Sequence, residues 1–153
     1  MWAVRRLLDI PQWSPSRLLR SIGLLICIAS LAPWAYGEPY FGRHTMYLPG
    51  ALYGQGQLTL LSGLVILWGA WRHRHKQLPQ ASLLILAAAF GLCVAVAVST
   101  LLDPMFLRRL PGGGMLFEGW ATHTVSPAVW IIGFSGVTGI TVCVQRLHRQ
   151  PAR

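Results

Sequence analysis

The sequence predicts an all-α integral membrane protein, folded as a four-helix bundle. Hydrophobic residues make up 54% of the 153 residues and charged residues only 11%, whereas about a quarter of a soluble domain is charged. Four segments each reach the roughly 20 residues that a helix needs to cross about 30 Å of hydrocarbon. These predicted spans are residues 18–36, 51–71, 81–102 and 125–144. Little of the chain is left for a separate soluble catalytic domain.

Residues 1–17 precede the first span and mix apolar side chains with arginines. Trp2 and Leu7 lie beside Arg5 and Arg6, and prolines then interrupt the segment. This pattern predicts a short amphipathic segment that lies on the cytoplasmic surface of the membrane, next to the first span. A docking arm for a partner protein is an alternative role.

The second span carries a polar run near its outer end, at Gln55, Gln57 and Thr59. Polar side chains at membrane depth usually hydrogen-bond to a neighbouring helix, so we expect packing rather than substrate binding from these residues. Tryptophan prefers the membrane–water interface. Trp34 falls at the outer end of the first span and Trp68 at the inner end of the second, which agrees with that preference.

Small residues recur at helical spacing along the third and fourth spans, every four positions in the third and every three in the fourth. Such faces let helix backbones approach closely, which lipid alone does not favour. We expect these faces to pack within the bundle, and contact with another subunit is the alternative for one of them. The predicted helix-packing residues are Ala87, Gly91, Ala95, Ser99, Gly133, Gly136 and Gly139.

The second and fourth spans match each other at a constant offset. "LSGLVIL" at 61–67 aligns with "FSGVTGI" at 134–140, and "HKQ" at 75–77 then falls on "HRQ" at 148–150. Each half of the chain is an outgoing helix, an external loop and a returning helix that ends in a basic tail. The alignment therefore favours two duplicated helical hairpins.

Basic residues set the predicted orientation, because Lys and Arg are kept on the cytoplasmic side. The side with both termini and the loop between the second and third spans has ten basic residues, and the other side has three. Both termini are therefore predicted to be cytoplasmic, and loops 37–50 and 103–124 external. An arginine-rich chain without asparagine indicates a bacterial genome, and with it the bacterial cytoplasmic (inner) membrane.

The two external loops share a short pattern. "EPYFGRHTMYLP" at 38–49 and "EGWATHTVSP" at 118–127 each run from a glutamate to a His-Thr pair and a proline. Two glutamates and two histidines can supply oxygen and nitrogen ligands to a divalent metal or form an acid–base pair. Ion pairs between the acids and the arginines of these loops are the simpler interpretation. The candidate metal ligands are Glu38, His44, Glu118 and His123.

Other kinds of chemistry have little support in the sequence. No ionisable residue lies in the middle of a span, which argues against a proton-coupled carrier, and no histidine lies deep enough to ligate haem iron. Cys27, Cys93 and Cys143 stand singly in three spans, whereas a thiol relay needs two within reach. We expect these cysteines to be buried packing residues. The sequence names no cofactor.

The function that the sequence favours is that of a non-catalytic accessory, assembly or stabilising subunit of a larger bacterial membrane complex. A small membrane enzyme or metal-handling protein with a site on the outer face is one alternative, and a passive transporter is another. The expected partners are other membrane subunits and membrane lipids. Anionic headgroups account for the net charge of +9, so we expect no nucleic acid.

Overall fold

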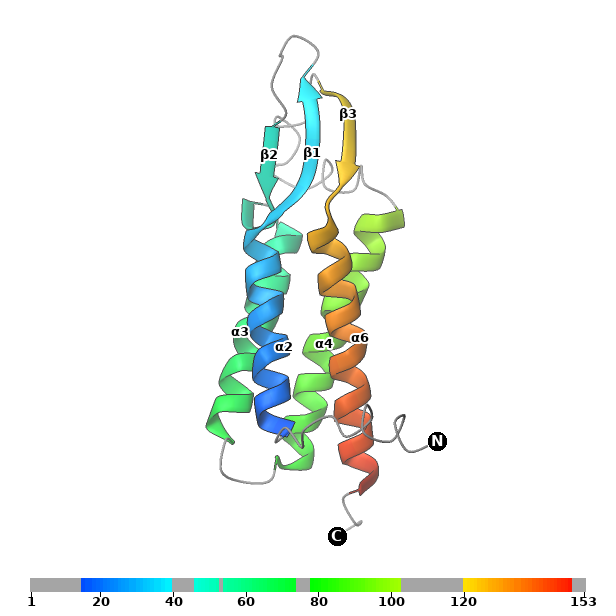
Figure 1. Cartoon of the computed structure of the whole chain (residues 1–153). Coiled ribbons are helices and arrows are strands. Elements are labelled where there is room, and N and C mark those ends of the chain that lie inside the picture. Colours follow the sequence, from blue (N-terminus) through cyan, green and yellow to red (C-terminus); the bar gives the residue numbers. More distant parts are fainter. Residues whose placement is uncertain (1–14, 40–45, 53, 74–77, 103–119, 150–153) are drawn as a thin grey trace, which may run out of the picture.

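The computed structural model describes residues 15–39, 46–52, 54–73, 78–102 and 120–149. Four helices run alongside one another, and three short strands stand at one end of them (Figure 1). The prediction of four helices is confirmed. The helices are α2 (Pro15–Leu31), α3 (Gly54–Arg72), α4 (Gln80–Leu102) and α6 (Pro127–Arg149). Two of them, α4 and α6, are long and apolar enough to cross a membrane.

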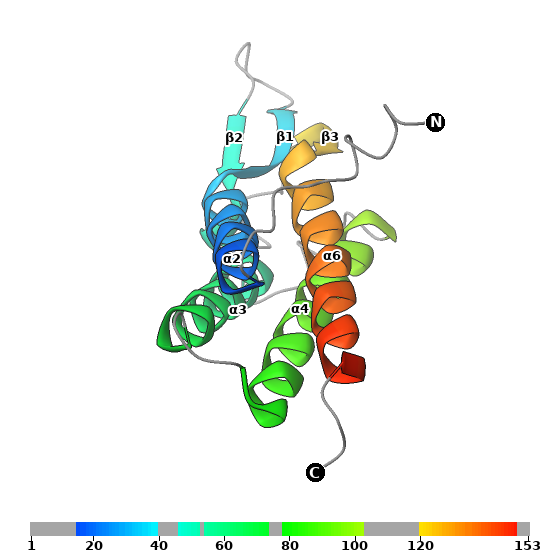
Figure 2. The ribbon, with the colours of Figure 1, turned by 60° about the horizontal axis from the view of Figure 1, so that its bottom comes forward.

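The helices are arranged as two antiparallel pairs, α2 with α3 and α4 with α6 (Figure 2). The pairs meet where α2 packs on α6 and α3 on α4, so the four helices close a ring. The N-terminal end of α2 and the C-terminal end of α6 lie at the same end of the bundle, opposite the strands (Figure 1). Large side chains that are almost completely buried fill the centre, among them Leu19, Ile26, Ile66, Phe90 and Ile132.

The first helix ends earlier than hydropathy predicts, at Leu31 rather than near residue 36. Pro33 is the cause, because proline has no amide hydrogen to continue the helical pattern and disfavours helical geometry at the residue before it. The last helix instead continues to Arg149, beyond the predicted end at 144. Its final turn is polar and basic, so the hydropathy of the sequence gives no sign of it.

Strands occupy parts of the two segments predicted to be loops, 37–50 and 103–124, and the first strand begins within the predicted first span of 18–36. β1 (Pro33–Pro39) lies between β2 (Met46–Pro49) and β3 (Trp120–Val125), and pairs antiparallel with both. A 3-10 turn, η1 (Gly50–Leu52), leads from β2 into α3. The sheet joins segments that are far apart in the chain, and it ties the first hairpin to the start of α6 (Figure 1).

Trp34 joins the sheet to the bundle. It lies just beyond the end of α2, as predicted, but as a core residue rather than as an exposed interfacial anchor. Its side chain is completely buried, and its Nε1–H donates to the Ala29 carbonyl at 2.9 Å. Its own carbonyl accepts from the Ser126 amide at 2.9 Å. The indole also lies against the backbone of Gly50, where a Cβ would overlap the ring. Trp34 thus connects the end of α2, the turn before α3 and the start of α6.

The two returning helices, α3 and α6, are buried in the same pattern. The offset that aligns the two "SG" motifs relates residues 55–72 to residues 128–145. At every one of these positions the two helices have the same degree of exposure, whether buried, half-buried or exposed. Helices α3 and α6 also begin at equivalent residues, Gly54 and Pro127. Helices α3 and α6 are therefore similar both in sequence and in the way that they pack in the bundle.

The crossings within the two pairs also correspond. A Cβ at Gly63 would lie 3.3 Å from both the carbonyl oxygen of Gly23 and the amide nitrogen of Cys27. A Cβ at Gly136 would lie 3.0 Å from the carbonyl oxygen of Phe90 and 3.3 Å from the amide nitrogen of Val94. In both pairs a glycine of the returning helix faces the same four-residue interval of the outgoing helix, so the backbones meet in the same register.

Candidate functional site

The structure describes the backbone of two of the four candidate metal ligands. Glu38 lies in β1 and His123 in β3, and these strands pair with Gly37 opposite His123 and Glu38 opposite Thr122. The two residues are therefore one position apart in the register of neighbouring strands. His44 and Glu118 lie outside the described residues. Among the residues that the structure does describe, no group of three or more His, Cys, Asp or Glu is placed to hold a metal.

The predicted small-residue face of α6 is used within the bundle. Gly133 lies next to Ala97, and Gly136 next to Val94, where added Cβ atoms would meet these side chains at 3.3 and 2.6 Å. A Cβ at Gly139 would overlap the ring of Phe90. These glycines let α6 lie directly on α4, as small residues do between membrane helices.

The small-residue face of α4 is placed differently. Ala87 is half-buried and packs against the core, whereas Ala95 and Ser99 are exposed. A Cβ at Gly91 would meet no atom within 4 Å. The α4 face, defined here as Gly91, Ala95 and Ser99, therefore lies on the outside of the bundle without a helix of this chain across it in the described structure.

A polar layer lies at the end of the first hairpin that carries the strands. The hydroxyls of Ser30 on α2 and Thr59 on α3 are 2.8 Å apart and buried. Each hydroxyl also lies near a carbonyl of its own helix. Ser30 Oγ is 2.8 Å from the Ile26 carbonyl oxygen, and Thr59 Oγ1 is 3.0 Å from that of Gly56. One hydroxyl therefore donates to the other, and the second donates to the backbone. The expected role of Thr59 in joining helices is confirmed.

The two glutamines of the predicted polar run differ from Thr59 and from each other. Gln57 is exposed, and its side-chain amide donates to the Ala51 carbonyl at 3.3 Å. Gln55 is 4% exposed, and both polar atoms of its side chain lack a hydrogen-bond partner. Its counterpart in the second hairpin, by the same offset, is Ala128. A buried amide without partners is costly, so Gln55 marks a place where a water or another polar group would be stabilised.

The three cysteines are buried and free, as expected of packing residues. They lie on three helices, at Cys27 on α2, Cys93 on α4 and Cys143 on α6. No disulfide joins them. Their placement adds to the core and supplies no exposed thiol for redox chemistry.

Of the surfaces that the sequence pointed to, the structure thus leaves the open α4 face and the sheet that carries the backbones of Glu38 and His123. Comparisons with known proteins add nothing to this choice. No family model matches the chain, and neither a curated protein nor a solved structure shows significant similarity to it.

Proposed function

We propose that this chain is a multi-pass membrane protein that acts as a non-catalytic accessory, assembly or stabilising subunit of a larger membrane complex. Large apolar side chains are exposed along all four helices, as for Leu24, Leu64, Leu84 and Phe134. Contiguous exposed apolar surface on this scale is unusual for a soluble monomer. None of the four helices contains an acidic residue, which supports a structural role over proton-coupled transport.

The observation that carries the proposal is the contrast between the two small-residue faces. The α6 face is occupied by α4, whereas the α4 face, Gly91, Ala95 and Ser99, is open. Association of membrane helices depends on close packing of small residues rather than on a hydrophobic driving force. An open face of this kind is suited to the transmembrane helix of another subunit.

The proposed location is the bacterial cytoplasmic membrane, with both termini in the cytoplasm. The bias of ten basic residues against three supports this orientation. The cation–π contact of Arg72 with Trp68, with the guanidinium 5.3 Å from the ring centre, lies at the end of α3 that this orientation places at the cytoplasmic interface. Both residue types favour such positions.

The test is extraction in a mild detergent, followed by native gels and mass spectrometry of the proteins that co-purify. We expect defined partner subunits with the wild-type chain. Gly91→Leu/Ala95→Leu should weaken the association more than about tenfold, the effect of a mismatch of roughly 1.4 kcal/mol. Thr141→Leu, which enlarges an exposed position of α6, is the matched control and should keep the partners. A wild-type chain that is always a solitary monomer would contradict the proposal.

We also propose that the bundle arose by duplication of a helical hairpin. The matching burial of α3 and α6 and the equivalent glycine crossings support it. The sheet is the part that departs from the repeat, because α2 ends at Leu31 whereas α4 continues to Leu102. After a duplication, we expect new functions to arise in the parts where the two hairpins differ.

A metal-handling site on the outer face is a second candidate, and it rests on the repeated sequence pattern that includes Glu38, His44, Glu118 and His123. The structure places the backbones of Glu38 and His123 on neighbouring strands, one position apart in register. Elemental analysis of the purified protein tests it directly. Near-stoichiometric metal in the wild type that is lost in His44→Ala/His123→Ala would support the site. Absence of metal from wild type loaded with zinc or manganese would exclude this version of the function.

A further inference from the structure

A groove runs between α2 and α3 at the end of the bundle opposite the sheet. It is an open groove with a volume of about 520 Å³, and it is lined by Arg17, Arg20, Ser21, Leu24 and Leu67. Its volume is within the range of small-molecule sites, about 300–1,000 Å³. The groove is amphipathic along its length, because two guanidinium groups and a hydroxyl lie towards the N-terminal end of α2 and two leucines follow.

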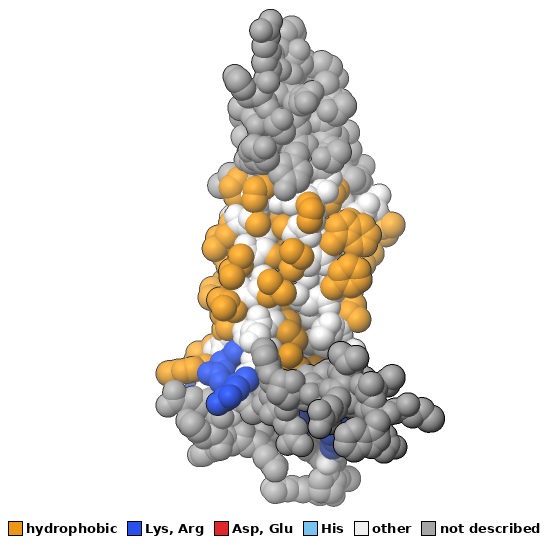
Figure 3. Space-filling model, viewed as in Figure 1, with side chains coloured by type: hydrophobic (Ala, Val, Ile, Leu, Met, Phe, Trp, Pro, Cys, Tyr) orange, Lys and Arg blue, Asp and Glu red, His pale blue; other side chains and the backbone are white. Residues whose placement is uncertain are grey.

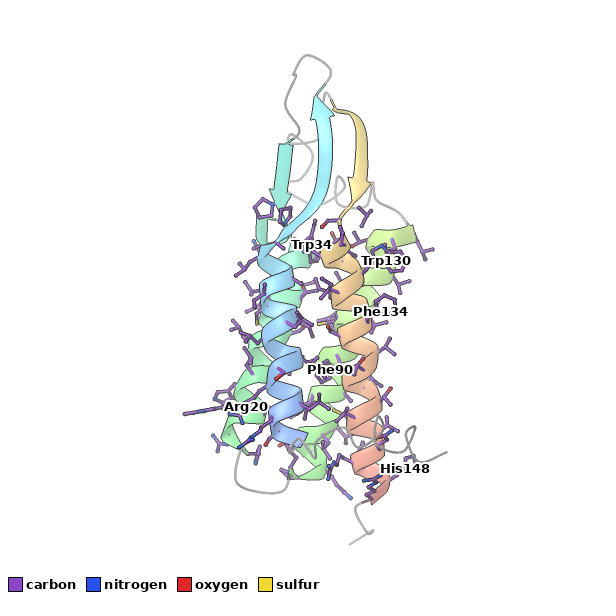
Figure 4. All side chains as sticks on the ribbon, viewed as in Figure 1. Arg20, Trp34, Phe90, Trp130, Phe134 and His148 are labelled. Carbon is purple, nitrogen blue, oxygen red and sulfur yellow. The ribbon has the colours of Figure 1, made fainter. Side chains whose placement is uncertain are left out.

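The two arginines are presented on one side of α2. They are three residues apart, which places them on neighbouring turns of one face. The Arg20 Nε–H donates to the Ser16 carbonyl at 3.2 Å, which holds the stem of this side chain along its own helix. Figure 4 shows Arg20 extending from the lower part of α2 towards the outside of the bundle. Arg17 is exposed and Arg20 half-buried.

The groove lies where the apolar surface of the bundle gives way to basic side chains (Figure 3). Leu24 and Leu25 on the next turn of α2 are 53% and 45% exposed. A ligand in the groove would therefore meet positive charge at one end and hydrocarbon at the other. A phospholipid with an anionic headgroup has this distribution of charge and apolar surface.

The second hairpin provides an internal comparison. The glycine crossings fix which positions of the two hairpins are equivalent. On the outgoing helices, the equivalent of Arg17 is Leu84, that of Arg20 is Ala87, that of Ser21 is Ala88 and that of Leu24 is Gly91. On the returning helices, the equivalent of Leu67 is Ile140. None of these five equivalent positions therefore carries a basic or hydroxyl side chain. The α4/α6 hairpin thus packs without arginines at these positions. The positive charge of the α2/α3 groove is therefore not needed for packing, and a ligand would explain it.

We infer that the α2/α3 groove is a binding site for an anionic phospholipid of the cytoplasmic leaflet. The lipid phosphate would bind between Arg17 and Arg20, with Ser21 as a further donor, and an acyl chain would lie along Leu24 and Leu67. Arginine favours phosphate because its planar guanidinium group can donate two hydrogen bonds at once. The inference rests on the proposed membrane location and does not depend on which partner the α4 face binds.

The test is native mass spectrometry of the full chain released from nanodiscs that contain phosphatidylcholine with phosphatidylglycerol. We expect one retained phosphatidylglycerol per chain and no retained phosphatidylcholine. Arg17→Gln/Arg20→Gln should reduce retention about 25-fold, since each charge near the surface contributes about fivefold in affinity. The control variant, Arg146→Gln/Arg149→Gln, removes the same charge from exposed positions of α6 at the same end of the bundle. It should retain the lipid.

A second variant separates lost binding from lost folding. Ser21→Trp keeps both arginines and fills the groove from an exposed position, so it should also release the lipid while the chain melts at the wild-type temperature. Equal loss in both double-arginine variants would show diffuse charge attraction and overturn the site. Competition by inorganic phosphate at millimolar concentration would show a phosphate site rather than a lipid site. Release of the chain from membranes by alkaline carbonate would instead disprove the membrane location itself.

Discussion

Individual glycines decide how closely the helices of this bundle approach. Gly63 and Gly136 each lie against the backbone of the partner helix, at distances that leave no room for a side chain. Gly91 belongs to the same residue type and to a helix of the same bundle, yet a Cβ there would meet nothing. The presence of glycine in the sequence thus does not by itself distinguish a contact within the chain from an open surface.

This contrast predicts opposite effects for the same substitution. Gly136→Ala should destabilise the bundle by about 1–3 kcal/mol, because Val94 and the Phe90 backbone must move to admit the methyl group. Gly91→Ala should be neutral or should stabilise the bundle by up to about 1 kcal/mol, through the higher helix propensity of alanine. Unfolding of the purified protein in mixed micelles with increasing sodium dodecyl sulfate would measure both. A loss of stability in Gly91→Ala would mean that the α4 face is already filled.

At the scale of helices, the two pairs fill one equivalent layer in opposite ways. Gly23 on α2 faces Ile66 on α3, where a Cβ would lie 2.9 Å from the isoleucine methyl. At the equivalent places in the second pair, Phe90 is on α4 and Gly139 on α6, and the ring occupies the space beside the glycine. The large side chain has moved from the returning helix to the outgoing one, and the layer remains closely packed.

The reciprocal arrangement predicts a measurable coupling between Phe90 and Gly139. Gly139→Ile alone should destabilise the fold, because the new side chain overlaps the ring. Phe90→Gly alone should cost about 3–5 kcal/mol through the cavity that it leaves. The double variant recreates the first hairpin's pair and should recover part of this loss, with a coupling of about 1–3 kcal/mol. Additive losses in a double-mutant cycle of unfolding free energies would contradict the equivalence of the two layers.

The elements differ in how well the sequence predicts them, for physical reasons. The helices can be predicted because a long apolar run favours a helix, in which the backbone hydrogen bonds are made within the segment itself. The sheet cannot be, because β1 pairs with a strand more than eighty residues away and its sequence, "PWAYGEP", begins and ends with proline. Trp34 is buried against the turn at Gly50, and its carbonyl accepts a hydrogen bond from distant Ser126, contacts that form only in the folded chain. Local patterns therefore suggested an interfacial tryptophan where the fold places a buried one.

The same reasoning explains what was predictable of the candidate sites. The small-residue faces could be identified from spacing, but which face is open depends on how α4 and α6 pack. Glu38 and His123 were identified from a repeated pattern of residues, and their neighbouring strands emerged only with the sheet. The α2/α3 groove was not predicted, because Leu67 joins Arg17 and Arg20 only when α3 lies beside α2.

At the scale of the whole molecule, charge and apolar surface are separated along the axis of the bundle (Figure 3). The helices expose large apolar side chains along their middle turns, whereas Arg17, Arg20, Arg146 and Arg149 lie near the end at which α2 begins and α6 ends. The opposite end carries the sheet (Figure 1). A membrane would stabilise this arrangement with the basic end in the cytoplasm.

This orientation can be tested with single cysteines in a variant in which the three native cysteines, all buried, are replaced by alanine. Gln57 and Gln145 are both exposed and lie at opposite ends of the bundle, near the start of α3 and the end of α6. A membrane-impermeant maleimide added to intact spheroplasts should label Gln57→Cys and leave Gln145→Cys unmodified, because only the sheet end faces outward. Inverted vesicles should reverse the result, which controls for differences in reactivity between the two sites. Labelling of Gln145→Cys alone in spheroplasts would place the basic end outside and contradict both the proposed topology and a groove in the cytoplasmic leaflet.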